Sequence, residues 1–461
     1  MIKPHKLAAY RLLHDGMLAF TRAEHVGMRI DVAYCERKRD FLTKKIVHLQ
    51  EQLKKTNFVK HWIHFYKDKF NLSSNHQLSR ILYDVKKIPP SRLTASGKGS
   101  TDDRALLDLN IPELNDLLEI RKLTKIRDTY LDAFVREQVN GVVHPFFNLH
   151  TVRTYRSSSD RPNFQNIPKR DKEAMKICRR AILPRPGHQL MEADYSGIEV
   201  RISACYHKDR TMLEYINDPR SDMHLDMAKQ IFLMPDMVKG GPAAVLRNAA
   251  KNGFVFPQFY GDYYKNCANY LVGEWGKLPQ ATWKAGQGIS IGNGVTLSDH
   301  LIANGIKSFD KFVEHLQKIE DHFWKVRFKE YQQWKEVLWN KYQKVGYIDL
   351  LTGFRCGGVM SKNDVTNYPI QGSAFHCLLW SFIELDKIAI QECWDTKLIG
   401  QIHDAILLDV YPPELDHVVA TVKRVACDEL RKVWKWIITP LDVDVDVCEV
   451  NGSWADKNSY E

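Results

Sequence analysis

The chain has 461 residues, enough for about two to four domains, and its 66 Lys and Arg against 56 Asp and Glu leave a net charge of +10 that suits a polyanionic partner. Nine cysteines without a Cys-x-x-Cys pair argue against a disulfide framework and a thiolate zinc site, and no apolar run approaches the roughly 20 residues of a membrane helix. Because the N-terminus also lacks the apolar core of a signal peptide, we expect a soluble, cytoplasmic protein without a membrane partner.

The first 184 residues divide into three stretches by pattern. Residues 1–32 end in a helix that runs into a Gly-bearing turn and a short strand. From residue 33 to about residue 69 the pattern is helical and dense in Lys and Arg, which alone indicates only a solvated basic face. Further helices are expected up to about residue 140, and in a loop among them Lys98 lies between two glycines, where it could approach a backbone phosphate closely. Residues 141–184 alternate apolar residues with Arg, Thr and Ser, as strands and turns do.

A short strand and the start of a helix follow at residues 188–201. Gln189 to Asp194 has the pattern of a strand, and Ser-Gly-Ile-Glu-Val-Arg after it has a helical composition. Asp194 would therefore stand at a strand-to-helix corner, where α/β sheets usually bind ligands. The alternative role for this carboxylate is a helix N-cap.

After residue 240, two basic residues lie four positions apart, and two aromatic residues that follow them have the same spacing. Arg247 and Lys251 would face one side of a helix, and Phe256 and Tyr260 repeat the step. A basic pair alone indicates a solvent face. A cationic end beside an aromatic end, however, fits the triphosphate and the base of a nucleotide.

Apolar and aromatic residues recur at helical spacing from Phe312 to Tyr342. This spacing predicts one long amphipathic helix. Its aromatic stripe is more typical of a core than of a binding platform.

A polar pair separates two apolar runs between Leu398 and Val410. This pattern predicts a β-hairpin with His403 and Asp404 at its tip. A solvated turn residue is the common explanation for such an Asp. Beside Asp194, however, Asp404 completes a pair of carboxylates that repel each other unless cations lie between them, so the pair predicts a metal site.

Six strings, in this order along the chain, resemble DNA polymerase family A, the polymerase I-like enzymes. They are Thr154-Tyr-Arg156-Ser-Ser-Ser-Asp-Arg-Pro-Asn-Phe-Gln165-Asn-Ile-Pro168, Asp194-Tyr-Ser-Gly-Ile-Glu199-Val-Arg201 (motif A), Arg247-Asn-Ala-Ala-Lys251 with Phe256-Pro-Gln-Phe-Tyr260-Gly261 (motif B), Asn367-Tyr-Pro-Ile-Gln371-Gly372, Gln401-Ile-His403-Asp404 (motif C) and Glu449-Val-Asn-Gly-Ser-Trp454. Each string is moderately specific alone, and their common order leaves little room for chance.

The resemblance implies an α+β protein with the right-hand polymerase fold, in which a palm with an antiparallel sheet carries a helical thumb and helical fingers. It places the start of the palm at residues 1–32, the thumb at 33–140, more palm at 141–210, the fingers at 211–345 with an insertion near 262–310, and the rest of the palm at 346–461. It also implies that the chain is the polymerase region only and that it is of a phage or mobile-replicon type. We expect such a chain to have no proofreading exonuclease of its own.

The implied function is that of a template-directed DNA polymerase. Such an enzyme adds deoxynucleotides to a primer 3′-hydroxyl by phosphoryl transfer with two Mg²⁺ ions. Its partners would be primer–template DNA, dNTPs and separate replication proteins, and the chain itself would be a monomer. A catalytically lapsed nucleic-acid-binding protein and a two-metal nuclease are the alternatives.

The resemblance also assigns roles to individual residues. Metal binding falls to Asp194, Asp404 and the backbone carbonyl of Tyr195. Nucleotide binding falls to Arg247, Lys251, His224, Phe256, Tyr260 and Glu199. Among these, Lys251 is also a catalytic proton donor, Phe256 stacks on the nucleotide, and Glu199 excludes a ribose 2′-hydroxyl. DNA binding falls to Arg156, Asn367, Gln371 and His403, to which the Gly-rich loop adds Lys98.

The chain departs from the family pattern at four points. Gly197 replaces the usual Gln, Tyr155 the usual Gly, and Ala405 an acid that often follows the motif C Asp. One extra residue lies between Lys251 and motif B's aromatic end, which a local helix bulge would absorb. This insertion leaves Phe254 as a rival to Phe256 for the stacking role.

Overall fold

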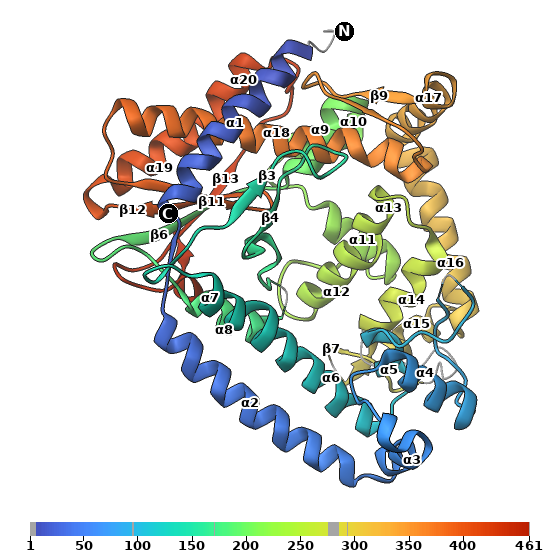
Figure 1. The fold of residues 1–461 in the computed structure, drawn as a ribbon. Helices are drawn as coiled ribbons and strands as arrows, with labels where there is room; N and C mark the ends of the chain where they lie inside the picture. The colour runs from blue at the N-terminus through green and yellow to red at the C-terminus, as the bar shows by residue number, and fades with distance from the viewer. Residues whose placement is uncertain (1–5, 95, 170, 275–284, 293, 461) are drawn as a thin grey trace.

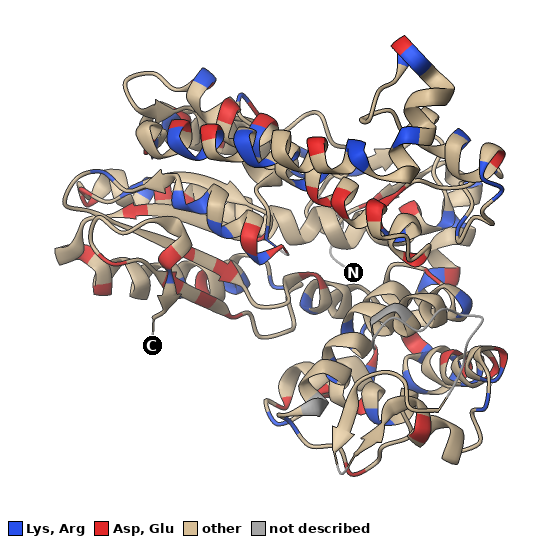
Figure 2. Ribbon diagram, turned by 90° about the horizontal axis from the view of Figure 1, so that it is seen from below, with Lys and Arg blue, Asp and Glu red and all other residues tan. Residues whose placement is uncertain are grey.

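A five-stranded antiparallel sheet, here named the central sheet because both helical arms extend from it, lies on the left of Figure 1. The computed structural model describes residues 6–94, 96–169, 171–274, 285–292 and 294–460. Figure 2 shows Lys and Arg spread over both arms and intermixed with Asp and Glu. No helix within these ranges is long and apolar enough to cross a bilayer.

The central sheet has the strand order β11-β12-β6-β13-β14. Its strands are β6 (Gln189–Tyr195), β11 (Lys397–Ile402), β12 (Ala405–Val410), β13 (Val443–Val447) and β14 (Asn458–Ser459). The strand ending near Asp194 and the hairpin with His403 and Asp404 at its tip are thereby confirmed. Both β6 and β12 are buried along nearly their whole length, because helices pack on the sheet.

Helices from both ends of the chain cover the central sheet (Figure 1). They are α1 (Lys6–Val26), α18 (Lys362–Gln391), α19 (Leu415–Lys423), η8 (Arg424–Glu429) and α20 (Leu430–Val433). The short elements around them are β9 (Tyr347–Asp349), β10 (Arg355–Gly357), η7 (Pro412–Glu414) and η9 (Trp454–Asp456). The start of the chain therefore packs against its last third.

The first arm consists of residues 32–137 and is helical, as expected. Its elements are α2 (Val32–Lys55), α3 (Asn57–Tyr66), η1 (Lys67–Lys69), α4 (Asn75–Ser79), η2 (Arg80–Val85), α5 (Asp103–Asp108), α6 (Pro112–Lys125), η3 (Ile126–Leu131) and α7 (Asp132–Glu137). It shares one hydrophobic core with the central sheet. Between arm and sheet lie β1 (Met28–Ile30), β2 (Val142–Val143), β3 (Phe146–Asn148), β4 (Ser158–Asp160), η4 (Phe164–Asn166), α8 (Lys172–Arg180) and β5 (Ile182–Leu183).

The second arm consists of residues 198–345 and has a hydrophobic core of its own. Its elements are α9 (Ile198–His207), α10 (Arg210–Asn217), α11 (Met223–Ile231), α12 (Pro242–Ala250), η5 (Lys251–Val255), α13 (Phe256–Phe259), α14 (Tyr264–Glu274), β7 (Ser290–Gly292), β8 (Val295–Thr296), α15 (Leu297–Ala303), α16 (Phe309–His322), η6 (Phe323–Arg327) and α17 (Lys329–Val345). The two arms touch at Arg104, whose guanidinium lies 4.4 Å from the centre of the Tyr270 ring.

The prediction of one long helix from Phe312 to Tyr342 is wrong, because the chain leaves helical geometry at Phe328 (φ −117°, ψ 50°). The physical reason is a buried cap. Asp209 Oδ2 accepts hydrogen bonds from the backbone N–H groups of Glu330, at 3.1 Å, and Tyr331, at 3.2 Å. A new helix, α17, therefore begins there.

A buried ionic cluster fixes β6 two residues before Asp194. Glu192 Oε2 accepts from Arg179 at 3.2 Å, from Lys457 at 2.8 Å and from the Trp454 indole at 2.8 Å. Burial alone would raise the pKa of Glu192, but the two cations outweigh it and hold the pKa below its usual value.

Replacing Glu192 by Ala should lower the free energy of unfolding by about 3 to 5 kcal/mol, because it leaves a buried Arg179 without its partner. Urea unfolding measures this change, with Glu384→Ala, in a surface pair with Lys387, as a control that should cost about 0.5 kcal/mol or less.

The pH dependence of this difference has a definite sign. Since the pKa of Glu192 is depressed in the folded state, its contribution is present above about pH 4.3 and is lost as the pH falls through the folded value. A difference between wild type and mutant that grows on acidification would contradict this account.

Candidate active site

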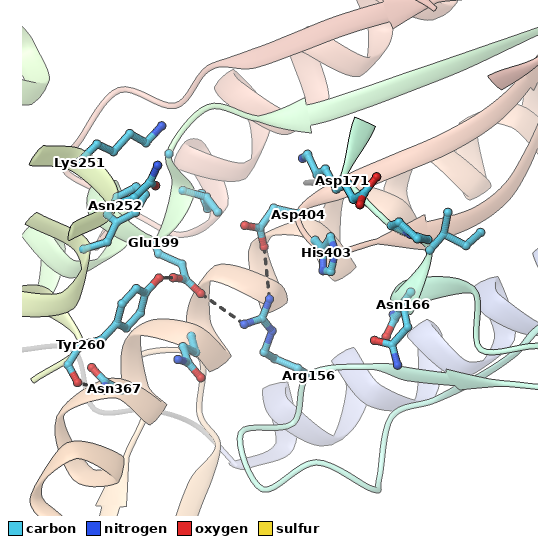
Figure 3. Close-up of a pocket in the computed structure, with 18 of the residues that line it drawn as sticks. Arg156, Asn166, Asp171, Glu199, Lys251, Asn252, Tyr260, Asn367, His403 and Asp404 are labelled. Carbon is cyan, nitrogen blue, oxygen red and sulfur yellow. Dashed lines mark hydrogen bonds and ion pairs between the residues drawn. The ribbon is translucent and has the colours of Figure 1, made fainter. Parts of the chain in front are cut away.

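A cleft of about 1210 Å³ lies where the central sheet and the two arms face one another (Figure 3). Its lining from the sheet and adjoining segments includes Arg156, Lys169, Gln371, His403 and Asp404. Its lining from the second arm includes Glu199, Lys251, Asn252, Phe256, Tyr260 and Tyr331, and its lining from the first arm includes Arg121, Lys122 and Tyr130. Three parts of the chain that are distant in sequence therefore share one cavity.

Sheet register brings the two predicted carboxylates together at one end of β6 and β12. Asp194 is paired with Ala405, the residue after Asp404, and the Tyr195 N–H donates to the Asp404 carbonyl at 3.1 Å. Asp404 lines the cleft. Asp194 does not line it directly, but its carboxylate accepts from Lys169 Nζ, which does, at 3.2 Å.

A polar chain crosses the cleft from the second arm to Asp404 (Figure 3). The Tyr260 hydroxyl donates to Glu199, and Arg156 reaches Glu199 at 3.3 Å and Asp404 at 3.6 Å. Asn367 donates to the Tyr260 carbonyl at 3.1 Å. Four of the predicted site residues and Asp404 are thus joined by direct contacts.

The electrostatics of the cleft favour a cation beside Asp404. Burial raises the pKa of Asp404 to about 6; Glu199 and Asp194 add to the shift, and Arg156 and Lys169 oppose it. Within the described ranges, no group of three or more His, Cys, Asp or Glu side chains could hold a metal. Two carboxylates fit Mg²⁺ nonetheless, since this ion is usually bound by one or two carboxylates together with ligand phosphates.

The side chain of Tyr195 points away from the cleft. It is buried, and its hydroxyl bonds to Ser381 Oγ at 2.8 Å and to the Ala426 carbonyl at 3.1 Å. Only the backbone of this residue could therefore take part in a metal site.

The extra residue of motif B is accommodated by a π-helix. Residues Lys251–Val255 form η5, and the Phe256 N–H donates to the Lys251 carbonyl five residues earlier. Lys251 Nζ lies 5.3 Å from the centre of the Phe256 ring. The bulge therefore keeps the cationic and aromatic ends on the same side, where both line the cleft.

Phe254, the rival residue, lies in the core of the second arm. It is fully buried and packs edge-on against Phe323, with ring centres 5.5 Å apart. Of the two residues, only Phe256 reaches the cleft.

Arg247 and His224 lie behind Lys251, around a smaller cavity of about 250 Å³. Arg247 Nε donates to Asp222 at 2.8 Å, and the His224 ring meets the Phe256 ring edge-on at 5.6 Å. Burial beside two cations lowers the pKa of His224 to about 4. Its buried Nδ1 has no hydrogen-bond partner in the part of the chain that the structure describes, so it is available to a ligand.

A hydrogen-bond network supports the hairpin tip next to the cleft. Gln401, buried on β11, donates to the carbonyl of His403 and accepts from Ser157 at 2.7 Å and from Gln165 at 2.6 Å. His403 has a left-handed backbone (φ 52°). Lys98, in contrast, lies exposed in a turn of the first arm and does not line the cleft.

Two departures from the family pattern coincide with left-handed backbone. Gly197 has φ 60°, which suits Gly. Tyr155 has φ 58° where the family usually has Gly, and its ring packs on Phe354 at 4.8 Å. The backbone at Tyr155 thus takes the conformation that a Gly would favour.

Sequence reasoning missed several residues that shape the site. Lys169 directly follows the string that ends at Pro168, but nothing in the sequence there pointed to a contact with Asp194. Asp222 precedes the predicted His224 but gave no sign of pairing with Arg247, and Tyr331 lay within the predicted long helix without being assigned a role.

The model of DNA polymerase family A matches residues 39–274, just over half of the chain. The chain belongs to this family. It is 27% identical over 446 residues to the thermostable DNA polymerase I of Thermus thermophilus, covering 93% of this chain and 46% of that protein. To DNA polymerase I of Lactococcus lactis subsp. cremoris it is 27% identical over 380 residues, covering 82% and 39%. The chain therefore spans less than half the length of either relative.

The fold is similar to a solved structure described as the POL domain of Pol1 from M. smegmatis in complex with DNA primer-template and dNTP. The TM-score is 0.72 at 23% identity, covering 96% of this chain and 70% of the other. The prediction of an α+β right-hand polymerase fold is confirmed.

The different places of the two Phe residues lead to a stability prediction. Phe254→Ala should lower the free energy of unfolding by about 3 to 5 kcal/mol, because it empties a core position. Phe256→Ala should cost about 1 kcal/mol or less, because that ring faces the cleft. Denaturant unfolding of both variants measures the difference, and the reverse order would contradict the placement of η5.

Proposed function

We propose that this chain is a template-directed DNA polymerase. It adds deoxynucleotides to the 3′-hydroxyl of a primer paired with a template. The observation that carries the proposal is the position of Asp194 and Asp404 at one end of the central sheet, beside a cleft that Asp404 lines together with the cationic and aromatic residues of motif B. In this proposal the first arm is the thumb and the second arm the fingers.

The reaction forms a bond between the primer 3′-oxygen and the α-phosphorus of the nucleotide and breaks the bond to pyrophosphate. Asp194, Asp404 and the Tyr195 carbonyl would hold two Mg²⁺ ions. Bound there, the ions would ease deprotonation of the primer hydroxyl and neutralise charge on the phosphates. Arg156 and Lys169, which pair with these carboxylates here, would be free to turn toward DNA and nucleotide.

The second arm would bind the nucleotide. Arg247, Lys251 and His224 would contact its phosphates, and burial lowers the pKa of Lys251, which suits a proton donor to the leaving pyrophosphate. Phe256 would stack on the base. Because Arg247 is paired with Asp222 here, phosphate binding would require the guanidinium to exchange this partner.

Selection of the sugar would fall to Glu199 and Tyr260. The Tyr260 hydroxyl holds the Glu199 carboxylate at the wall of the cleft, where a ribose 2′-hydroxyl would meet it. Rejection by steric and polar conflict is specificity through repulsion.

The duplex would contact Arg156, Asn367, Gln371 and His403 in and beside the cleft. Lys98, exposed on the first arm, would contact the backbone farther from the reacting end.

A proofreading exonuclease of this family would need a carboxylate cluster that begins with an Asp-x-Glu strand, and the sequence has one such string, Asp171-Lys-Glu173. Asp171 caps α8 by accepting from the Ala174 N–H at 2.9 Å, and Glu173 pairs with Lys122 at 2.7 Å. We propose that these two carboxylates are structural and that mismatched primer ends are extended slowly without trimming.

The metal assignment predicts the effect of two conservative substitutions. Asp194→Asn and Asp404→Asn should each lower the rate of primer extension with Mg²⁺ by roughly a thousandfold or more, because a neutral amide binds the cation far more weakly. Affinity for primer–template duplex, measured by fluorescence anisotropy, should change little.

Asp444→Asn is the matched control. Asp444 lies on β13, directly opposite Asp194 on β6, and accepts a hydrogen bond from Ser196, so the same substitution is made beside the proposed metal site and not in it. It should keep most of the activity. An active Asp404→Asn enzyme would overturn the assignment. A wild-type chain that binds duplex without extending it would instead favour a lapsed nucleic-acid-binding protein.

A further inference from the structure

Lys335 is a buried lysine in a cage of aromatic rings and backbone carbonyls. The residue is 7% exposed, and its Nζ lies 3.8 Å from the centre of the Trp324 ring and 4.8 Å from that of Tyr331. The ammonium donates to the carbonyls of Gln258 and Phe259, at 3.5 Å each. Within the described ranges no carboxylate forms an ion pair with it.

The two carbonyls belong to the last residues of α13, where helix carbonyls lack partners within the helix and a positive charge is favourable. Gln258 is also held through its side chain, because its Oε1 accepts from the Trp324 indole at 2.7 Å. Lys335 and Trp324 thus fix the end of α13 from behind.

Tyr260 follows these carbonyls directly and carries the contact to the cleft. Its hydroxyl donates to Glu199, and its own carbonyl accepts from Asn367 at 3.1 Å (Figure 3). The backbone around Tyr260 is therefore held on one side by Lys335 and on the other by Asn367. A shift of the α13 end would move the ring that aims the Glu199 carboxylate.

We propose that Lys335 is a positioning residue for sugar selection, which fixes the end of α13 so that Tyr260 holds Glu199 against the 2′ position of an incoming nucleotide. The inference rests on the proposed function and adds to it a residue that does not line the cleft. Lys335 acts through the backbone of residues 258–260.

The charge of Lys335 is held at a cost to stability. Burial lowers its pKa to about 7; Lys362 adds to the shift, and Glu336 opposes it. The folded pKa of Lys335 lies below the unfolded value of about 10.4. Burying the charged lysine therefore lowers the free energy of unfolding by its full amount below pH 7, and this loss disappears as the pH rises toward 10. Replacing Lys335 by an uncharged side chain of similar length should therefore not lower the free energy of unfolding. Loss of a contact that serves only stability would lower it.

The same titration should appear in sugar selection. As the pH rises through about 7, Lys335 loses its charge and its hold on the carbonyls weakens. Two titratable groups beside it keep their state over this range. Burial lowers the pKa of His207 to about 3 and raises that of Tyr331, so both stay neutral.

The test compares Lys335→Met with Lys341→Met, an exposed lysine of the same helix. The readout is the ratio of kcat/KM for a dNTP to that for the matching rNTP between pH 6 and 9, in which ionisations common to both substrates cancel. At pH 6, Lys335→Met should lower this ratio at least about tenfold, with an unchanged or higher melting temperature. Wild type should approach the mutant as the pH rises, and Lys341→Met should follow wild type.

A ratio in Lys335→Met equal to that of wild type at pH 6 would overturn the inference. So would a flat wild-type profile from pH 6 to 9, which decides the question even if the mutant does not fold. Glu199→Ala, measured in parallel, separates the two proposals. If Glu199→Ala leaves the ratio unchanged, the proposed role of Glu199 in sugar selection is wrong. If Glu199→Ala lowers the ratio and Lys335→Met does not, only the proposed role of Lys335 is wrong.

Discussion

The backbone pairing between β6 and β12 is the constraint on which the whole site depends. Six residue pairs, from Ala405 with Asp194 to Val410 with Gln189, fix the two strands against each other. A slip by one residue would turn every side chain of a strand to the opposite face. Since both strands are buried on both faces, such a slip would force side chains out of the positions into which they pack, and Glu192 out of its ionic cluster, so packing holds the two carboxylates in place. The buried cluster around Glu192 anchors the same strand.

Charge then organises the cleft around this pair. Each carboxylate faces a cation here, Asp194 with Lys169 and Asp404 with Arg156. Arg156 also binds Glu199, so one guanidinium links the sheet to the wall that the second arm contributes. In the proposed reaction, magnesium and nucleotide would replace these internal contacts by contacts with ligands, so that the same residues would serve both states.

Much of this arrangement could be predicted from local pattern. The alternation around Asp194, the apolar runs beside Asp404 and the four-residue step from Arg247 each describe one element, and sequence fixes such elements well. The extra residue after Lys251 was also evident from the number of residues between Lys251 and Tyr260, which exceeds that of the family pattern by one, and a π-helix accommodates it.

The contacts between distant elements could not be predicted in this way. Lys335 is one of many lysines in a helical stretch, and only the fold shows that its ammonium meets the end of α13. The break at Phe328 depends on Asp209, more than one hundred residues earlier in the chain, so the apolar spacing continued across it without interruption. Pairings of this kind depend on tertiary packing, which the spacing of apolar residues along the sequence does not reveal.

Template-directed addition of nucleotides in the cleft, as proposed above, is tested most directly by rapid-quench extension of one primer on four templates that differ only in the first unpaired base, with all four dNTPs and Mg²⁺ present. We expect the first nucleotide added to change with each template and to be the complementary one every time. Addition of the same nucleotide on all four templates, or shortening of the primer without any addition, would contradict it.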